Sequence, residues 1–371
     1  MQKKWLAVWG VASCIAPPTA AQYAKDITLR TTIRVNVGGT AVRIRLANPG
    51  TDSPVEIERA TVFNLSNDAA PVAFNASPIH IPGRGTVESD PVEMNVKPGD
   101  DLVVSLYLKE MTHLMSGVRV NGPLSRMAFS EGDTSMMRDP GALNITDTDA
   151  VRLLTELDVE TEDDAHAIIA YGDSITAQSW PDYLALRLER EKKNAAVVRR
   201  GISGNRVLRE YTSLHNRHYG IAGLKRFEDE IQVSGADRVI VLHGVNDIIH
   251  PDGVNPCRPW SDLPTAEQLI DGLRKYIEIA HRCGKKIYVS TITPINGWST
   301  YLPLREELRG KVNEWIRTSG EADGVIDFAA AVCSADDPTH LDPACDSGDH
   351  LHPSLEGARR MAESIPDSML D

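Results

Sequence analysis

One serine, one histidine and one aspartate stand in local sequences that suit nucleophilic catalysis. Ser174 ends the tetrapeptide Tyr-Gly-Asp-Ser, and its hydroxyl could attack a carbonyl carbon if a base removed its proton. His352 could act as that base, because Asp349 lies three residues before it and, in a helical turn, on the same face. The carboxylate would accept from Nδ1–H and leave Nε2 to take the serine proton. His350 is the competing histidine, but it is adjacent to Asp349 and is expected to point elsewhere.

Two further segments offer hydrogen-bond donors for the oxyanion that such an attack creates. Gly204 lies in the glycine-rich segment 201–205, where a backbone N–H can approach a substrate oxygen because no Cβ is in the way. Asn246 lies in Gly-Val-Asn-Asp, and its side-chain amide can donate to a developing negative charge. Together with the backbone N–H of Ser174, these groups predict an oxyanion hole of three donors.

Each segment has a plainer interpretation when it is taken alone. Asp173 or Ser174 could simply cap a helix, since both residue types are good caps. Asn246 and Asp247 could form an Asx turn, and the segment 201–205 could be an ordinary loop. The occurrence of all the segments in one chain favours the catalytic interpretation, in which Asp173 and Asp247 brace the loops.

The residues around these segments predict alternating strands and helices. Ser174 follows the continuous apolar run 167–171, and Asn246 follows a second buried run at 238–243. Further strands are expected at 286–292 and 324–328, and helices at 180–190, 265–283, 305–319 and 356–364. This alternation predicts an α/β fold, with a parallel sheet covered by helices on both faces. Ligands of such sheets bind beyond the carboxyl ends of the strands, where Ser174 and Asn246 are expected.

The N-terminal half has a different pattern. From residue 26 to about 108, short apolar-polar alternations are separated by turn residues, which predicts a β-sandwich or jelly roll. The segments 33–37 and 42–46, with two glycines between them, predict a β-hairpin. The stretch 109–164 is less regular and is expected to be a loop-rich bridge. We therefore expect a β-sandwich domain with its bridge over 26–160 and an α/β domain over 165–371.

Residues 1–21 have the pattern of an export signal. Two lysines precede a mostly apolar run from Trp5 to Ala16 that is too short to span a bilayer, and small residues offer cleavage after Ala21. This pattern predicts a secreted or periplasmic protein. One alternative is lipoprotein anchoring at Cys14, which would leave an unusually short signal. The other is a buried N-terminal helix.

The composition is that of a soluble globular protein. The 371-residue chain is 42% hydrophobic and 25% charged, with a formal net charge of −13. An acidic surface argues against nucleic acid or anionic lipid as a partner. Beyond residue 21, the sequence has no apolar run that is long enough to cross a membrane.

Removal of the signal would leave four cysteines, at positions 257, 283, 333 and 345, for which three pairings are possible. A bridge between Cys333 and Cys345 would restrain the segment just before His352. Free or differently paired thiols are the alternative. None of the four has the spacing of zinc ligands, so no metal site is expected.

The four segments, in this order, resemble the SGNH hydrolases, also called the GDSL lipase/acylhydrolase superfamily, over about residues 165–371. The residues that match the family's Ser, Gly, Asn and His, and then its triad acid, are Ser174, Gly204, Asn246, His352 and Asp349. The resemblance implies a flavodoxin-like three-layer α/β/α domain. It also implies ester hydrolysis through an acyl-enzyme, with no metal or other cofactor.

The resemblance leaves the substrate more open than the reaction. Some members with an N-terminal β-domain deacetylate plant polysaccharides, whereas others are described as arylesterases or lipases. Ala177-Gln178 departs from the family pattern, in which an acidic residue and a glycine are frequent near the pocket. Trp298 and Tyr301, beyond the strand expected at 286–292, could stack on a sugar ring or pack under their loop.

We expect a secreted serine carboxylesterase, most specifically an acetylesterase acting on carbohydrate. The chain is acidic and poor in aromatic residues, and it lacks a strongly apolar amphipathic helix that could form the rim or lid of a lipase. The alternatives are an arylesterase or lipase-type acylhydrolase, acyl transfer to a sugar, and a carbohydrate-binding protein without catalysis. An acylated carbohydrate is thus the expected partner, and neither nucleic acid nor a membrane span is expected.

Overall fold

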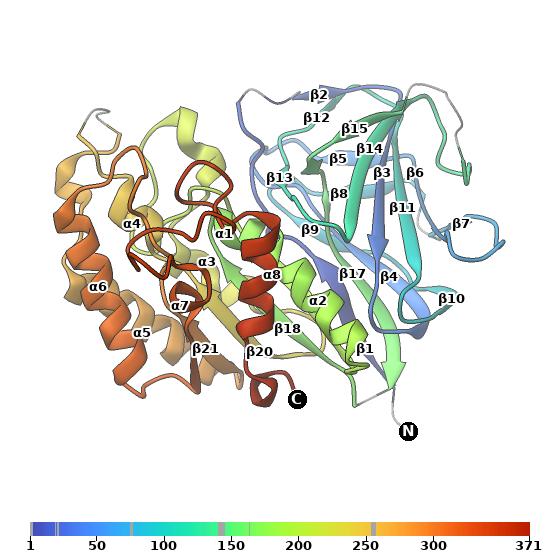
Figure 1. Ribbon diagram of the computed structural model, residues 1–371. Helices are drawn as coiled ribbons and strands as arrows, with labels where there is room; N and C mark the ends of the chain where they lie inside the picture. Colours follow the sequence, from blue (N-terminus) through green and yellow to red (C-terminus); the bar gives the residue numbers. More distant parts are fainter. Residues whose placement is uncertain are drawn as a thin grey trace. The chain divides into compact units, whose positions relative to one another are not determined.

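The structure is a computed structural model that describes residues 3–18, 20, 22–74, 77–139, 145–162, 164–253 and 257–371 (Figure 1). Tertiary contacts divide the chain into two compact units. The first comprises residues 1–167 and 188–198, and the second comprises residues 168–187 and 199–371. Strands dominate the N-terminal half of the chain, whereas strands and helices alternate in the C-terminal half.

Two antiparallel sheets form most of the first unit. One has the order β1 (Lys3–Gly10), β17 (Leu154–Glu162), β4 (Gly39–Ala47) and β10 (Val92–Val96), and β9 (Thr86–Glu88) also pairs with β4. The other has the order β15 (Thr146–Thr148), β14 (Ser125–Glu131), β3 (Ile27–Arg34), β11 (Asp101–Leu108), β6 (Arg59–Asn64) and β7 (Val72–Ala73). Three short ladders pair β2 (Tyr23–Ala24) with β12 (Thr112–His113), β5 (Val55–Ile57) with β8 (Ile79–Ile81), and β13 (Val118–Arg119) with β16 (Ala150–Val151).

Buried side chains of these strands form an apolar core. Val42, Ile44 and Leu46 of β4 are completely buried, and more exposed arginines lie between them. Leu157 and Val159 of the neighbouring β17 are also completely buried. Two antiparallel sheets around an apolar core confirm the predicted β-sandwich.

β3 and β4 belong to different sheets, so the predicted β-hairpin is wrong. β3 pairs with β11 and β14, whereas β4 pairs with β17, β9 and β10. Gly39 lies so close to β17 that a Cβ atom would meet the carbonyl oxygen of Glu160 at 2.6 Å. The glycines therefore allow a tight corner between two sheets. Alternation and turn residues predicted the strands correctly, but they do not specify which strand is the partner.

The prediction of a loop-rich bridge at 109–164 is also wrong for two segments of it, β14 and β17, which are long strands. β14 pairs with β3, and β17 lies between β1 and β4 in the interior of its sheet. The acidic residues Glu156 and Asp158 of β17 resemble those of a surface segment, but both are buried. Asp158 pairs with Arg43 at 2.9 Å, so the charge is compensated inside the sheet.

The segment predicted to be a signal peptide contributes a strand to the first unit. β1 pairs antiparallel with β17 from Lys3–Glu162 to Gly10–Glu156, and Leu6 and Ala7 are completely buried. The pairing of β1 with β17 differs from the expected removal of residues 1–21, because a segment that is cleaved off cannot supply a strand of the sheet. The physical reason is that a short apolar run rich in Trp and Val suits a signal and a buried strand equally well. Export itself stays a prediction.

The second half of the chain is built on one five-stranded sheet. Its order is β19 (Ala195–Gly201), β18 (His166–Gly172), β20 (Ala236–Leu242), β21 (Lys286–Ser290) and β22 (Gly324–Ile326). β20, β21 and β22 pair in parallel. Numbered along the chain, the order is 2-1-3-4-5, which is that of flavodoxin-like folds. The predicted α/β fold with a parallel sheet is confirmed.

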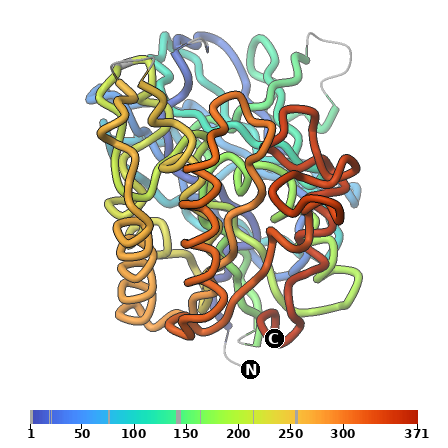
Figure 2. The backbone as a smooth tube through the Cα atoms, turned by 60° about the vertical axis from the view of Figure 1, so that its left-hand side comes forward, coloured from blue at the N-terminus to red at the C-terminus, as the bar shows by residue number. Residues whose placement is uncertain are grey.

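Helices cover this sheet (Figures 1 and 2). They are α1 (Ser174–Ala177), α2 (Trp180–Arg190), α3 (Gly223–Glu230), α4 (Val245–Ile249), α5 (Ala266–Arg282), α6 (Pro303–Thr318), α7 (Phe328–Val332) and α8 (Leu355–Ser364). Short 3-10 turns occupy Leu214–Tyr219, Trp260–Asp262 and Asp367–Met369. α5 packs against α3 and α6, and α7 packs against α8. The buried face of α5 carries Leu269, Leu273 and Tyr276, which recur at helical spacing.

The four predicted helices agree with α2, α5, α6 and α8 within two residues at each end. Strand β19 and helix α3 were not predicted. β19 carries Arg199 and Arg200, which are buried because they form ion pairs with Asp182 and Glu230. Paired arginines in a buried strand look polar in the sequence, and only their partners show that they are interior.

Cys283, Cys333 and Cys345 are free thiols, so the structure does not contain the bridge considered between Cys333 and Cys345. Among the described residues, no helix combines the length and the apolar character that crossing a membrane requires.

Candidate active site

Ser174 lies two residues after the end of β18, at the first position of α1. Asp173 caps this short helix, because its Oδ1 accepts a hydrogen bond from the N–H of Ile175 at 3.0 Å. The strand end is tightly packed, since a Cβ atom on Gly172 would lie 2.0 Å from the carbonyl oxygen of Leu242 in β20. Only glycine allows this approach, and the close packing of β18 on β20 holds the serine at the carboxyl edge of the sheet.

The histidine and aspartate near the C-terminus meet this serine. Oγ of Ser174 lies 2.8 Å from Nε2 of His352, across 178 positions of sequence. Nδ1 of His352 lies 2.6 Å from Oδ2 of Asp349. Because an ionised carboxylate can only accept, Nδ1 carries the proton and Nε2 is left to accept from the serine hydroxyl. The three side chains thus have the hydrogen-bond order of a Ser-His-Asp triad.

Local hydrogen bonds keep Asp349 ionised. Burial alone would raise the pKa of Asp349, but hydrogen bonds from the backbone and ring of His352 lower that pKa below its ordinary value. Oδ1 accepts from the N–H of Leu351 at 3.0 Å and from that of His352 at 2.8 Å. His350 faces away from this carboxylate, since its Nδ1 lies 2.6 Å from Asp346. The structure therefore joins His352, and not His350, to Asp349.

The glycine-rich segment 201–205 lies against both the serine segment and α4. The N–H of Ile202 donates to the carbonyl oxygen of Gly172 at 3.2 Å. The side-chain amide of Asn246 donates to the carbonyl oxygen of Asn205 at 3.0 Å. This bond uses one of the two N–H groups of the amide. The structure thus brings all four segments that carried the sequence prediction to one edge of the sheet.

Asp247 holds the continuation of the same loop. Its Oδ2 accepts from the N–H of Val207 at 2.7 Å, and its Oδ1 accepts from that of Leu208 at 3.0 Å. Burial raises the pKa of Asp247 to about 6, although these two bonds act in the opposite direction. The carboxyl group therefore links α4 to the loop that begins at Gly201.

Asp173 is the second buried carboxyl group at this edge. Burial raises its pKa to about 7; the hydrogen bond from Ile175 opposes this shift, and the charge of Asp247 adds to it. Its Oδ2 atom is inaccessible to solvent and has no hydrogen-bond partner among the described residues. A proton on this oxygen avoids a buried and unpaired negative charge.

Two positioning residues were missed by sequence reasoning. Arg226 of α3 is buried and donates to Oδ1 of Asn205 at 3.0 Å, to the carbonyl of Arg200 at 3.0 Å and to that of Gly172 at 2.8 Å. One guanidinium thus joins the serine segment, β19 and the glycine-rich loop. Nothing in the sequence of α3 distinguishes this arginine from a surface residue.

His243, directly after β20, is the second positioning residue that sequence reasoning missed. Its Nε2 donates to the carbonyl of Asn205 at 3.2 Å, and its Nδ1 accepts from the hydroxyl of Tyr276 at 3.0 Å. Burial and the nearby Arg226 lower its pKa to about 3, so the ring stays neutral. Its place in Leu-His-Gly, next to the segment that carries Asn246, is the one signal that could have found it.

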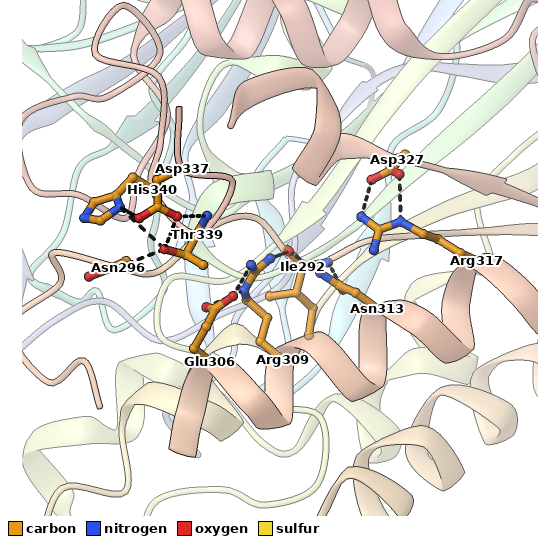
Figure 3. Close-up of polar contacts among 10 residues, drawn as sticks. All are labelled: Ile292, Asn296, Glu306, Arg309, Asn313, Arg317, Asp327, Asp337, Thr339 and His340. Atoms are coloured by element: carbon orange, nitrogen blue, oxygen red, sulfur yellow. Dashed lines mark hydrogen bonds and ion pairs between the residues drawn. The ribbon is translucent and has the colours of Figure 1, made fainter. Parts of the chain in front are cut away.

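The loop after β21 brings an indole ring to His352. The rings of Trp298 and His352 meet edge to face, with centroids 6.2 Å apart. Figure 3 shows the polar contacts that hold this loop: the carbonyl of Ile292 accepts from Arg309 and from Asn313, both at 2.8 Å, and Asn296 donates to Thr339 at 2.9 Å. Of the two aromatic residues singled out in the sequence, Trp298 is therefore the one next to the triad.

A model of the GDSL-like lipase/acylhydrolase family matches residues 170–360, which include all four segments. The chain belongs to this family. A comparison with curated proteins gives no match. Within the described ranges of this GDSL-family chain, no group of three or more His, Cys, Asp or Glu side chains is arranged to hold a metal ion.

Several solved structures are similar to about half of this chain. Axe2, an acetylxylan esterase from Geobacillus stearothermophilus, is 22% identical, covers 55% of this chain and 94% of its own, and has a TM-score of 0.40. A GDSL-like lipase from Bacteroides thetaiotaomicron is 17% identical, covers 55% of this chain and 87% of its own, and has a TM-score of 0.37.

Proposed function

We propose that this GDSL-family protein is a serine carboxylesterase that works through an acyl-enzyme. The observation that carries the proposal is the continuous hydrogen-bond chain from Ser174 to Asp349, with contacts of 2.8 Å and 2.6 Å on either side of His352. Family membership supports the same reaction class. The chain needs no rearrangement to place the base within reach of the nucleophile.

In the first half-reaction, Oγ of Ser174 attacks the ester carbonyl while Nε2 of His352 takes its proton. Asp349 stabilises the imidazolium and keeps its orientation. We propose that the N–H groups of Ser174 and Gly204 and the remaining amide N–H of Asn246 hold the oxyanion. Each such donor is worth roughly 3 kcal/mol of barrier reduction. His352 then gives its proton to the leaving alcohol, and the acyl group stays on the serine.

In the second half-reaction, His352 takes a proton from water, and the resulting hydroxide attacks the acyl carbonyl. The same donors hold the second tetrahedral intermediate. Its collapse releases the carboxylic acid, and the proton returns through His352 to Ser174. Asp173 and Asp247 take no proton from the substrate in this scheme, since they brace the two loops from buried positions.

For the substrate, we propose a short acyl ester on a carbohydrate, so that the protein is an acetylesterase. Two features support this choice. The partly exposed Trp298 lies beside the catalytic histidine and offers a flat apolar surface of the kind that sugar rings contact. The chain is also strongly acidic, with a net charge of −13, which suits a soluble substrate better than an anionic lipid surface.

Hydrolysis of p-nitrophenyl esters of increasing chain length, and acetate release from acetylated polysaccharides, test both levels of this proposal. We expect activity on the acetyl ester and on at least one polysaccharide, and none with Ser174→Ala. A preference for long acyl chains would replace the acetylesterase assignment with a lipase-type one. Equal rates for the wild type and Ser174→Ala would end the esterase proposal and leave a binding protein. Ester products in the presence of a sugar alcohol would instead indicate acyl transfer.

A further inference from the structure

Residues 202–205 form a turn whose central amide carries the N–H of Gly204. The turn is closed by the N–H of Asn205, which donates to the carbonyl of Ile202 at 3.1 Å. Gly204 has a φ of +77°, which is the value of the third residue in a type II turn. The N atom of Gly204 is bonded to the Cα atom of the same residue, so the place of its N–H depends on the contacts that hold the turn.

Both carbonyl groups that follow this amide are held by side chains. The carbonyl of Asn205 accepts from Asn246 at 3.0 Å and from His243 at 3.2 Å. The carbonyl of Gly204 accepts from the hydroxyl of Tyr211 at 2.9 Å. The contact from Asn246 comes directly from α4. The contact to Gly204 comes from Tyr211, whose hydroxyl has a second partner.

The hydroxyl of Tyr211 also contacts Nδ1 of His250. A tyrosine hydroxyl has one proton, and a carbonyl oxygen can only accept, so this proton goes to Gly204. Nδ1 of His250 must then be the donor to the tyrosine oxygen. Burial, with Arg258 and Arg206 nearby, lowers the pKa of His250 to about 3, so this ring is neutral and carries its single proton at Nδ1. The relay from His250 through Tyr211 to Gly204 thus has a defined direction.

His250 lies one helical turn after Asn246, and its N–H donates to the carbonyl of Asn246 at 3.2 Å. The two side chains therefore lie on the same side of α4. One reaches Asn205 directly and the other reaches Gly204 through Tyr211. Consecutive carbonyl groups of the glycine-rich loop are thus held from one short helix.

Tyr211 itself is well fixed. It is buried, and its ring lies 5.0 Å from that of Tyr219. The guanidinium of Arg206 lies 4.1 Å from the centre of the Tyr211 ring. A Cβ atom on Gly204 would clash with the Tyr219 ring at 2.3 Å, so the turn is packed on this aromatic group with no space for a side chain. A rigid partner of this kind can hold a carbonyl in one direction at little entropic cost.

We propose that Tyr211 and His250 are positioning residues, which hold the carbonyl of Gly204 and with it the backbone of this residue, so that its N–H stays at its place beside the oxyanion. This inference rests on the proposed function, in which Gly204 is an oxyanion donor. Neither residue touches the reacting atoms in this scheme. Their effect reaches the reaction through the position of one N–H group, and therefore through the transition state more than through substrate binding.

The test is kinetic and uses Tyr211→Phe, which removes the hydroxyl and keeps the ring. We expect kcat for p-nitrophenyl acetate to fall about 10-fold with little change in KM. An alkylboronic acid, which forms a tetrahedral adduct on Ser174, should bind about 10-fold more weakly. The matched control is Tyr107→Phe, which removes a hydroxyl that donates to Asp26 at 2.8 Å in the β-sandwich. The control should keep both wild-type values.

A second pair of variants tests the direction of the relay and serves if Tyr211→Phe does not fold. Asparagine can place an N–H near the position of Nδ1, whereas glutamine extends toward the position of Nε2. We therefore expect His250→Asn to keep most of the wild-type kcat and boronate affinity, and His250→Gln to lose both. Equal behaviour of the two variants would overturn the inference, as would a Tyr211→Phe effect confined to KM.

The same assays separate this inference from the proposed function. If the wild type and Ser174→Ala do not differ, the esterase proposal fails first. If they differ strongly and Tyr211→Phe matches Tyr107→Phe in kcat and boronate binding, the esterase proposal stands and the positioning role is wrong.

Discussion

Nε2 of His352 lies 2.8 Å from Oγ of Ser174, although the two residues lie near opposite ends of the part of the chain that forms the α/β fold. Ser174 follows β18, which is the first strand of that sheet along the chain, and His352 precedes the last helix, α8. The contact therefore forms only when the sheet is complete. Reactivity of the serine should depend on an intact fold far more than on local sequence.

Replacement of Ser174 by alanine should abolish ester hydrolysis without unfolding the protein. The loss in kcat should be at least about 10³-fold, because the covalent intermediate can no longer form. Steady-state kinetics with p-nitrophenyl acetate measure the loss, and circular dichroism checks the fold. Retention of most of the activity in a folded Ser174→Ala variant would show that another residue is the nucleophile.

Asp349→Asn should lower kcat by about 10⁴-fold while Asp346→Asn has a much smaller effect. The asparagine cannot fix the Nδ1–H tautomer of His352, whereas Asp346 pairs with His350 instead. Both substitutions remove one negative charge from the same loop, so the pair controls for general electrostatics. Similar kinetic losses in the two variants would contradict the assignment of the triad acid.

The buried carboxyl of Asp173 should make stability fall as pH rises. Its folded-state pKa, about 7, lies above the ordinary value of 3.8, so the folded protein binds more protons than the unfolded chain between these pH values. By linkage, the free energy of unfolding decreases as pH increases across that range. Asp173→Asn keeps an oxygen for the N–H of Ile175 and removes the titration.

Thermal unfolding of the wild type and Asp173→Asn from pH 4 to pH 8 measures this effect. The wild type should lose stability relative to the variant by roughly 1–4 kcal/mol across the series, since each unit of pKa shift corresponds to about 1.4 kcal/mol. A constant difference at all pH values would show that Asp173 is ionised in the folded protein throughout.

Arg226→Ala should destabilise the α/β part by about 3–5 kcal/mol and lower kcat as well. The substitution leaves buried acceptors on Gly172, Arg200 and Asn205 without their donor. Arg282→Ala, which breaks an exposed ion pair with Glu228, is the matched control and should cost at most about 1 kcal/mol. Urea denaturation measures both. Equal losses in the free energy of unfolding for the two variants would contradict the role of Arg226 in holding the three segments together.

Removal of residues 1–21 should destabilise the β-sandwich, because β17 would lose its β1 partner. Within β1, Leu6→Ala should cost about 2–5 kcal/mol and the exposed Lys3→Ala less than about 1 kcal/mol. Thermal unfolding of the three proteins measures these effects. Unchanged stability after the deletion would agree with the export prediction, in which this segment is removed. Identification of the N-terminus of the protein in culture medium or periplasm would test that prediction directly.

Trp298→Ala should raise KM for an acetylated oligosaccharide by about 2- to 13-fold, because a lost ring contact is worth about 0.5–1.5 kcal/mol. KM for p-nitrophenyl acetate should change little. Tyr301→Ala is the control from the same loop. An equal loss of kcat on both substrates would indicate that Trp298 supports His352 and does not contact the sugar.

The sequence alone determined the residue types of the candidate catalytic centre and most of the elements that carry them. Ser174, Gly204, Asn246 and His352 stand in short segments with strong local signals, and long helices such as α2 and α5 have clear apolar periodicity. These features depend on neighbours in the sequence, which is why they could be predicted.

Only the tertiary structure decided which strands pair and which polar residues are interior. β1, β17 and β19 resemble a signal or surface segments in the sequence, but strand pairing and buried ion pairs make them part of a core. Arg226, Tyr211 and His250 likewise acquire their roles through contacts with the glycine-rich loop. The physical reason is that the energy of a buried polar group depends on its partner, and these partners are set by the path of the chain in space.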